Sequence, residues 1–282
     1  MTTKPVSSIA DVAAAVTATL QQHPSALLSD FDGTLSQVSP TPDTAEAAPG
    51  AGQTMADLAS KLALTAIVTG RGITDVSQRL AAPGLVYVGN HGLEWLVGGE
   101  HHVHPAGQAA RKVLAEALRD IDQRLRAHVS LEGVIFEDKV YSASIHYRLA
   151  PDPMAVRTIL APVMQEVATE YGFWVSEGKM VFELRPGEAV NKGSATEQLL
   201  VDHGIRSAVF LGDDVTDADA FLVLRRLRET EGISAVAVGV LTLDTAPQVI
   251  DAADYLLDGV DDVVAMLLQV NEALATSFEE KA

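Results

Sequence analysis

The chain has 282 residues, with 20 Lys and Arg against 38 Asp and Glu and no cysteine. This length suits one large or two modest domains, and 48% hydrophobic with 21% charged residues is typical of a soluble globular protein. A net charge of −18 argues against binding to bulk nucleic acid or to an anionic membrane, and the lack of cysteine excludes disulfides. The first residues show no signal-peptide core, and no apolar run approaches the roughly 18 residues of a membrane span. We therefore expect a cytoplasmic monomer with a small-molecule substrate.

In chain order, residues 8–22 have helical spacing with Ser8 as a cap. Strands and helices then alternate twice along the chain, at 26–31, 53–63, 64–68, 73–80 and 85–89, and again at 194–204, 207–212, 217–230, 233–239 and 261–275. Such alternation predicts a parallel sheet with helices on both faces. We expect an α/β fold with a doubly wound, Rossmann-like core formed by residues 1–100 and 188–282.

The pattern changes between residues 101 and 187. Helical stretches at 106–128 and 151–170 are each followed by two short strands, at 134–138 with 141–149 and at 171–176 with 179–185. Two successive α-β-β units predict an antiparallel sheet with helices on one face. We expect an inserted α+β cap domain over 101–187, with hinges near Gly98-Gly99 and Pro186-Gly187.

Two carboxylates follow the first predicted strand of the core. Asp30 and Asp32 come directly after the apolar Ala26–Leu28 and share one face of the extended chain. Like charges this close stay ionised only with a cation between them, and open α/β sheets place their ligands at such strand ends. One Asp could attack as a nucleophile while the other moves a proton, with a hard divalent metal screening both. Taken alone, the stretch could equally be a polar turn.

Three further segments place polar side chains at strand or helix ends. Thr69-Gly70-Arg71 ends the apolar run 62–68, Lys192 stands at a loop-to-helix junction, and the acidic run 212–217 follows another apolar strand. Together with Asp30 and Asp32, these segments resemble, in order, the four motifs of the haloacid dehalogenase superfamily. Within it, the chain is similar to trehalose-6-phosphate phosphatases from Leu27 to about Leu268. Further stretches that carry this similarity are Gly89–Glu94, Glu137–Lys139, His146–Arg148 and 178–186. Among them, Asn90–Glu94 and His146–Arg148 are more specific to the family than the four superfamily motifs.

The resemblance implies Mg²⁺-dependent hydrolysis of trehalose 6-phosphate through an aspartyl phosphate. It makes Asp30 the nucleophile and Asp32 the general acid and base, and an acid at position 32 favours a phosphatase over the P-type ATPases, which have Thr there. Phosphate-binding groups are then Thr69, Gly70, Arg71 and Lys192. The candidate metal ligands are Asp30, Asp32 (by its carbonyl), Asp213, Asp214 and Asp217. Asp214 and Asp217 could ligate the metal directly or through water, or only hold Lys192 in place.

The predicted cap strands carry polar groups on one face and apolar groups on the other. In the strand over 141–148, the apolar face consists of Tyr141, Ala143, Ile145 and Tyr147, and the polar face of Ser142, Ser144, His146 and Arg148. In the strand over 179–184, one face carries Met180, Phe182 and Leu184, and the other carries Lys179, Val181 and Glu183. The polar face could simply be solvated. Above a phosphatase site it would instead recognise sugar hydroxyls, and the resemblance points to Glu137, Lys139 and Glu183. Further substrate-binding candidates are Lys179, His91 and Arg148.

Some features stay open at this stage. His91 and Glu94 could orient substrate or only fix the junction loop, and the histidines at 101, 102 and 104 could bind a transition metal or be solvated. Residues 1–24 match no known motif. Three other functions compete: a phosphatase for another sugar phosphate, a signalling receiver domain, and a non-catalytic sensor of trehalose 6-phosphate. A receiver has only about 120 residues, and a sensor would be expected to lack Asp30, Asp32 or Lys192.

Overall fold

The computed structural model describes residues 4–39, 41–128, 130–178, 180–187, 190–243 and 245–279. The chain forms two compact units, of which the first comprises Met1–His101 and Asn191–Ala282 and the second His102–Val190. From the sequence we placed the corresponding boundaries after residues 100 and 187. The second unit is therefore an insertion in the first.

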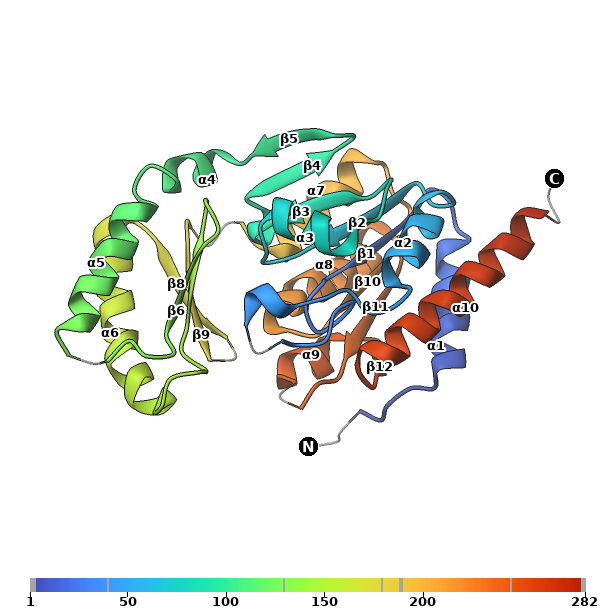
Figure 1. The fold of residues 1–282 in the computed structure, drawn as a ribbon. Helices are drawn as coiled ribbons and strands as arrows, with labels where there is room; N and C mark the ends of the chain where they lie inside the picture. Colours follow the sequence, from blue (N-terminus) through green and yellow to red (C-terminus); the bar gives the residue numbers. More distant parts are fainter. Residues whose placement is uncertain are drawn as a thin grey trace. The chain divides into compact units, whose positions relative to one another are not determined.

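The first unit is built on an eight-stranded sheet in the order β12-β11-β10-β1-β2-β3-β4-β5 (Figure 1). Its strands are β1 (Ser25–Ser29), β2 (Leu64–Val68), β3 (Val86–Gly89), β4 (Glu94–Val97), β5 (Glu100–Val103), β10 (Ser207–Gly212), β11 (Ser234–Val240) and β12 (Tyr255–Leu257). The strands from β12 to β3 pair in parallel, and β4 pairs antiparallel with β3. This arrangement confirms the predicted α/β class with a doubly wound parallel sheet.

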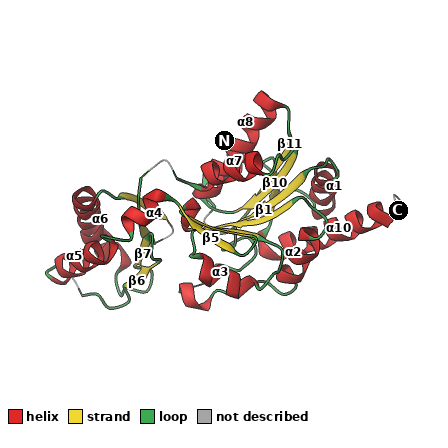
Figure 2. Cartoon of the chain, turned by 90° about the horizontal axis from the view of Figure 1, so that it is seen from above, coloured by secondary structure: helices red, strands yellow, loops and turns green. Residues whose placement is uncertain are grey.

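Helices cover both faces of this sheet, because neighbouring strand residues point to opposite sides. Leu27, Ile67 and Val209 pack with α1 (Ile9–Leu20), α2 (Ala51–Ala59), α3 (Ile73–Leu80) and α10 (Gly259–Glu279). Leu28, Val68 and Phe210 pack instead with α7 (Lys192–Asp202), α8 (Val215–Glu231) and α9 (Pro247–Ala252). Figure 2 shows α7 and α8 on one side of β1 and β10, with α2 and α10 on the other. Two apolar layers therefore hold the strand ends in place.

Local signals explain some element ends and the conformation of one glycine pair. The Ser8 side chain accepts a hydrogen bond from the Asp11 amide at the start of α1, which confirms the predicted cap. Gly98 and Gly99, predicted as a hinge, lie between β4 and β5 with φ angles of 59° and 87°. Two consecutive positive φ angles are the requirement of a tight hairpin turn. The pair therefore serves as a turn within the sheet.

The second unit contains a four-stranded antiparallel sheet in the order β6-β7-β9-β8. Its strands are β6 (Ile135–Asp138), β7 (Ala143–His146), β8 (Trp174–Gly178) and β9 (Val181–Arg185), and its helices are α4 (Pro105–Ala110), α5 (Leu114–Arg126) and α6 (Pro153–Tyr171). The helices α5 and α6 lie on one face of this sheet (Figure 1). Ile145, Phe182 and Leu184 are buried against them, as the alternation predicted. Met180 differs, because it lies in the β8–β9 turn with a φ of 61° and is exposed.

The short helical segments η1 (Pro42–Thr44) and η2 (Asn90–Gly92) complete the described structure. Among the described residues, none of the helices combines the length and the apolar character that crossing a membrane requires.

Candidate active site

Three polar side chains follow the carboxyl ends of adjacent parallel strands. Asp30 follows β1, Thr69 follows β2 and Asp213 follows β10, and β1 lies between the other two. The Asp30 amide donates to the Leu211 carbonyl at 2.9 Å, so the ladder between β1 and β10 continues to the nucleophile candidate. Asp30, Thr69 and Asp213 are all at most 4% exposed. The strand register therefore gathers, at one edge of the sheet, residues that are distant in the sequence.

Lys192 connects two buried carboxylates in this group. Its Nζ lies 2.9 Å from Asp30 Oδ1 and 2.8 Å from Asp217 Oδ1. The Asn191 side chain accepts from the Ser194 amide at the start of α7, which fixes the first turn that carries Lys192. The Lys192 side chain is 2% exposed. One buried cation thus faces two buried acids, and their charges balance only if one acid keeps its proton or a further cation is bound.

The pKa values of these groups reflect that imbalance. Burial raises the pKa of Asp30 to about 8 against the opposing effect of Lys192, and the charges of Asp217 and Asp32 raise it further. Burial also raises the pKa of Asp217 to about 6. Burial alone would lower the pKa of Lys192, but attraction by Asp217 and Asp30 raises it above its ordinary value. Such shifts are typical of functional sites.

A divalent metal fits between the acids of this site. Asp30, Asp213 and Asp217 each place one carboxylate oxygen within 4.8 Å of the others, and all three are buried. Gly33 supports this arrangement, because a Cβ added there would lie 2.3 Å from the Asp213 carboxyl carbon. Carboxylate oxygens and a buried excess of negative charge suit a hard cation such as Mg²⁺.

Asp217 has a different local role from the other two acids. Its Oδ2 accepts from the backbone amides of Asp213 and Asp214 at 3.0 and 2.9 Å, and its Oδ1 accepts from Lys192. These contacts fit an acid that holds Lys192 and the β10–α8 turn. Among the described residues that could hold a metal, the group of three includes neither the Asp32 nor the Asp214 side chain.

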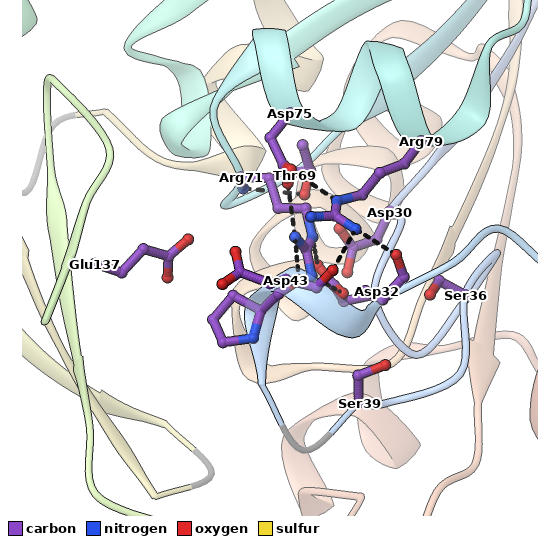
Figure 3. Close-up of polar contacts among 12 residues, drawn as sticks. Asp30, Asp32, Ser36, Ser39, Asp43, Thr69, Arg71, Asp75, Arg79 and Glu137 are labelled. Atoms are coloured by element: carbon purple, nitrogen blue, oxygen red, sulfur yellow. Dashed lines mark hydrogen bonds and ion pairs between the residues drawn. The ribbon is translucent and has the colours of Figure 1, made fainter. Parts of the chain in front are cut away.

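Asp32 is held by Arg71 in a bidentate ion pair. Arg71 Nε lies 2.6 Å from Asp32 Oδ2, and Nη2 lies 2.8 Å from Oδ1 (Figure 3). Arg71 Nη1 also donates to Asp75 at 2.6 Å and to the Pro42 carbonyl at 3.1 Å. The guanidinium that we predicted to bind phosphate is therefore engaged with Asp32. Asp75, in the first turn of α3, was not predicted as a site residue.

The backbone around Gly70 lies against His91. The Thr69 hydroxyl accepts from the Arg71 amide at 3.2 Å, and the Thr69 carbonyl accepts from the His91 amide at 2.9 Å. A Cβ at Gly70 would lie 2.5 Å from His91 Nε2, so only glycine fits beneath the ring. His91 is 5% exposed. The structure thus places His91 in the support of the 69–71 turn.

The second unit carries a cluster of ionisable groups on one sheet face. Lys139 Nζ lies 3.8 Å from Glu137 and 3.5 Å from Glu183, and His146 Nε2 lies 2.9 Å from Glu137. Arg185 adds a further cation 3.9 Å from Glu183. His146 and Arg185 were not predicted as site residues, although their alternation with buried positions placed them on this face. Of the other candidates, Arg148 is half-buried, and Lys179 lies outside the described residues.

Comparison with known proteins identifies the family. The trehalose-phosphatase family model matches residues 28–259. Trehalose-phosphate phosphatase of Mycobacterium bovis is 33% identical over 244 residues, covering 82% of this chain and 61% of that protein. The Mycobacterium marinum protein of the same name is 38% identical over 203 residues, covering 70% of this chain and 50% of that protein. The chain therefore spans about half to three fifths of the length of these relatives.

Solved structures show the same fold. The C-terminal domain of Candida albicans trehalose-6-phosphate phosphatase gives a TM-score of 0.75 at 20% identity, covering 95% of this chain and 98% of that one. A trehalose-6-phosphate phosphatase related protein gives a TM-score of 0.72 at 24% identity, covering 89% and 99%. The family match extends from β1 to the start of α10 and includes all the site segments described above. The chain belongs to the trehalose-phosphatase family.

Proposed function

We propose that the protein hydrolyses trehalose 6-phosphate to trehalose and inorganic phosphate. The observation that carries this proposal is the buried Asp30 carboxylate, which stands at a strand end beside Lys192 and Asp213. Family membership supplies the substrate class. The loss-of-function signature of a sensor, a missing Asp30, Asp32 or Lys192, is not found in the sequence.

In the first step, a carboxylate oxygen of Asp30 attacks phosphorus. The Asp30 O–P bond forms while the bond from phosphorus to the sugar oxygen breaks, which leaves an aspartyl phosphate. Asp32, which must enter this step protonated, gives that proton to the departing sugar oxygen and is left as a carboxylate. Lys192, at 2.9 Å from Asp30, favours the ionised form that the attack requires. Lys192, the Thr69 hydroxyl and the Gly70 amide are the groups proposed to hold the transferring phosphoryl oxygens.

In the second step, water attacks phosphorus and the Asp30 O–P bond breaks. Asp32 now takes the proton of that water and returns to its starting state. Its side chain is 39% exposed, so both a sugar oxygen and water can approach it. The bidentate contact with Arg71 limits the positions that the carboxylate can take.

Asp30 and Asp213 are the side chains proposed to hold Mg²⁺, with Asp217 behind them positioning Lys192. When bound, the metal supplies positive charge that stabilises the charge developing on the phosphoryl group. Two observations support Mg²⁺ binding here. Three buried acids lie close together, and the missing side chain of Gly33 leaves space that the Asp213 carboxylate occupies.

The second unit is proposed as a cap that recognises the sugar. Lys139 lies within 4 Å of both Glu137 and Glu183, so the three side chains offer both signs of charge and can accept hydrogen bonds from sugar hydroxyls and donate to them. Phosphate chemistry in the first unit does not require these groups. Specificity and chemistry are thus assigned to separate units.

The test measures initial rates of phosphate release from trehalose 6-phosphate, sucrose 6-phosphate and glucose 6-phosphate, with and without Mg²⁺. We expect a clear preference for trehalose 6-phosphate and a requirement for the metal. Asp30→Asn should reduce turnover more than about 100-fold, or ~3 kcal/mol in activation free energy, because a neutral amide cannot attack phosphorus. Faster hydrolysis of another sugar phosphate would show that trehalose 6-phosphate is not the preferred substrate. A fully active Asp30→Asn variant would show that Asp30 is not the nucleophile.

A further inference from the structure

A buried glutamate outside the reacting groups connects the strand β4 to the phosphate-binding turn. Glu94, the first residue of β4, is 6% exposed. Its Oε1 accepts from the Ile73 amide at 3.0 Å and from Asn90 Nδ2 at 2.7 Å, while Oε2 lies 2.9 Å from His101 Nε2. Both carboxylate oxygens are therefore occupied by groups of the protein itself.

The donors to Oε1 belong to segments that flank the proposed phosphate site. Ile73 begins α3 directly after the 69–72 turn, and its amide is one of the first-turn donors that a helix cannot satisfy internally. Asn90 begins η2, whose backbone amides bond the same turn. The Asn90 amide donates to the Arg71 carbonyl at 2.8 Å, and the His91 amide donates to the Thr69 carbonyl at 2.9 Å. Glu94 thus connects Asn90 in η2 with Ile73, which directly follows the 69–72 turn.

The backbone of η2 has an uncommon conformation. Asn90, His91 and Gly92 have φ angles of 50°, 57° and 112°, and two consecutive non-glycine residues with positive φ are unusual, although Asn and His adopt such angles more often than other side chains do. Such conformations persist only where neighbouring contacts over-determine them, and they concentrate at functional sites. The contacts with Glu94, Thr69 and Arg71 provide that constraint.

Close packing leaves these segments no room to move independently. A Cβ at Gly89 would lie 2.9 Å from both the Arg71 carbonyl oxygen and Glu94 Oε1. The η2 turn also packs against α7, which carries Lys192 at its first position. One cluster of contacts therefore touches both elements proposed to hold the phosphoryl group.

We propose that Glu94 is a positioning residue, whose carboxylate fixes the backbone of residues 69–73 as a phosphate-binding segment. It acts through Ile73 and Asn90 and has no free oxygen for substrate. This inference rests on the proposed phosphatase function and assigns Glu94 the role of support rather than of sugar contact.

The test compares Glu94→Ala, Glu94→Gln and Asn90→Gly in two assays. Inorganic phosphate binding in the presence of Mg²⁺ is measured by calorimetry, and kcat and KM are measured with trehalose 6-phosphate and p-nitrophenyl phosphate. Glu94→Ala should weaken phosphate binding and lower kcat/KM on both substrates to a similar degree, by about 100-fold, as misplacement of catalytic groups by 1 Å can do. Glu94→Gln retains an acceptor oxygen for Ile73 and Asn90 and should recover most of the loss. Asn90→Gly removes one donor while tolerating the positive φ, so its loss should be smaller than that of Glu94→Ala.

Glu100→Ala, an exposed position on β5, is the matched control and should stay within about twofold of wild type. If Glu94→Gln is as damaged as Glu94→Ala, the charge itself matters and the positioning role is overturned. Loss of activity on trehalose 6-phosphate alone would instead make Glu94 a sugar contact. If Glu94→Ala does not fold, Glu94→Gln and Asn90→Gly still decide the question. A wild-type protein that binds phosphate but ignores trehalose 6-phosphate would refute the proposed function and leave this inference testable.

Discussion

Arg71 donates a hydrogen bond to each carboxylate oxygen of Asp32, with N–O distances of 2.6 and 2.8 Å. The same guanidinium donates to Asp75, and Asp75 in turn accepts from Arg79 at 2.7 Å. Arg79 bonds the Asp43 carbonyl at 3.2 Å, so the chain of contacts ends on the η1 loop (Figure 3). The proposed general acid and base is therefore fixed by a network that extends from α3 to η1, and Arg71 is its central member.

Arg71→Lys should lower kcat on trehalose 6-phosphate by at least about tenfold, the general acid–base contribution being roughly 10²–10⁴. A lysine ammonium keeps the charge but cannot form the two parallel bonds that orient Asp32. Steady-state kinetics with p-nitrophenyl phosphate, whose leaving group needs little protonation, should show a smaller loss. Arg119→Lys, on the exposed surface of α5, is the control and should behave as wild type. Equal losses on both substrates would assign Arg71 to phosphate rather than to Asp32.

Gly33→Ala should impair Mg²⁺ binding through a direct clash. The new Cβ would lie 2.3 Å from the Asp213 carboxyl carbon, and the φ of 75° adds about 1–2 kcal/mol of strain for a residue with a side chain. Gly50→Ala separates these two effects, because Gly50 has a φ of 85° with nothing within 4 Å of the added Cβ. Both variants should lose thermal stability, but only Gly33→Ala should bind Mg²⁺ at least about tenfold more weakly by calorimetry. Equal Mg²⁺ affinity in the two variants would argue against Asp213 as a ligand.

Mg²⁺ affinity should rise with pH up to about 8 and then level off. The raised pKa of Asp30 means that the metal-free carboxyl holds its proton below pH 8, and a metal must displace that proton. Because Mg²⁺ and the proton compete for the Asp30 carboxylate, Mg²⁺ binds more tightly as the proton concentration falls. If one proton is released, the affinity should rise roughly tenfold per pH unit below 8. In the metal-free protein, the raised pKa of Asp30 stabilises the fold at low pH. This stabilisation is lost as the pH rises through 8. Calorimetry at pH 6, 7, 8 and 9 checks this, and Asp30→Asn should flatten the profile.

The sequence was informative where a residue's role depends on its position along one strand. The pair Asp30 and Asp32, the Thr69 turn and the apolar face of β9 followed from periodicity, because a strand fixes which face each side chain occupies. The contacts between strands were not accessible in that way. The Arg71–Asp32 pair spans 39 residues, and the contact from Glu94 to the Ile73 amide spans 21. Only the packed fold determines which of several nearby acids a guanidinium or an amide meets.

Short elements were harder to recognise in the sequence for a related reason. The three-residue strand β12 is held by pairing with β11, and its own sequence is too brief to show a period. Gly98-Gly99 was interpreted as a hinge because glycine permits both a hinge and a tight turn. The structure shows the tight turn between β4 and β5, and the boundary between the two units lies close by, after His101.

Damage to the second unit should differ kinetically from damage to the first. Lys139 lies within 3.8 Å of Glu137 and 3.5 Å of Glu183, so each member of this cluster depends on the others for charge balance. Lys139→Ala or Glu183→Ala should lower kcat/KM for trehalose 6-phosphate by one to three orders of magnitude, roughly 1.4–4 kcal/mol of lost transition-state binding. Hydrolysis of p-nitrophenyl phosphate, which has no sugar, should change little.

Lys112→Ala, an exposed lysine of the same unit, is the matched control and should leave both substrates unaffected. Thermal melting of each variant checks that the unit remains folded, since Lys139→Ala removes the cation that lies within 4 Å of both Glu137 and Glu183. Part of the loss should appear in kcat, because binding energy from the sugar is used to orient the phosphoryl group as well as to hold substrate. If both substrates lose activity equally while the melting temperature is unchanged, Lys139 and Glu183 serve the phosphoryl chemistry. In that case the sugar-recognition role of this face would have to be abandoned.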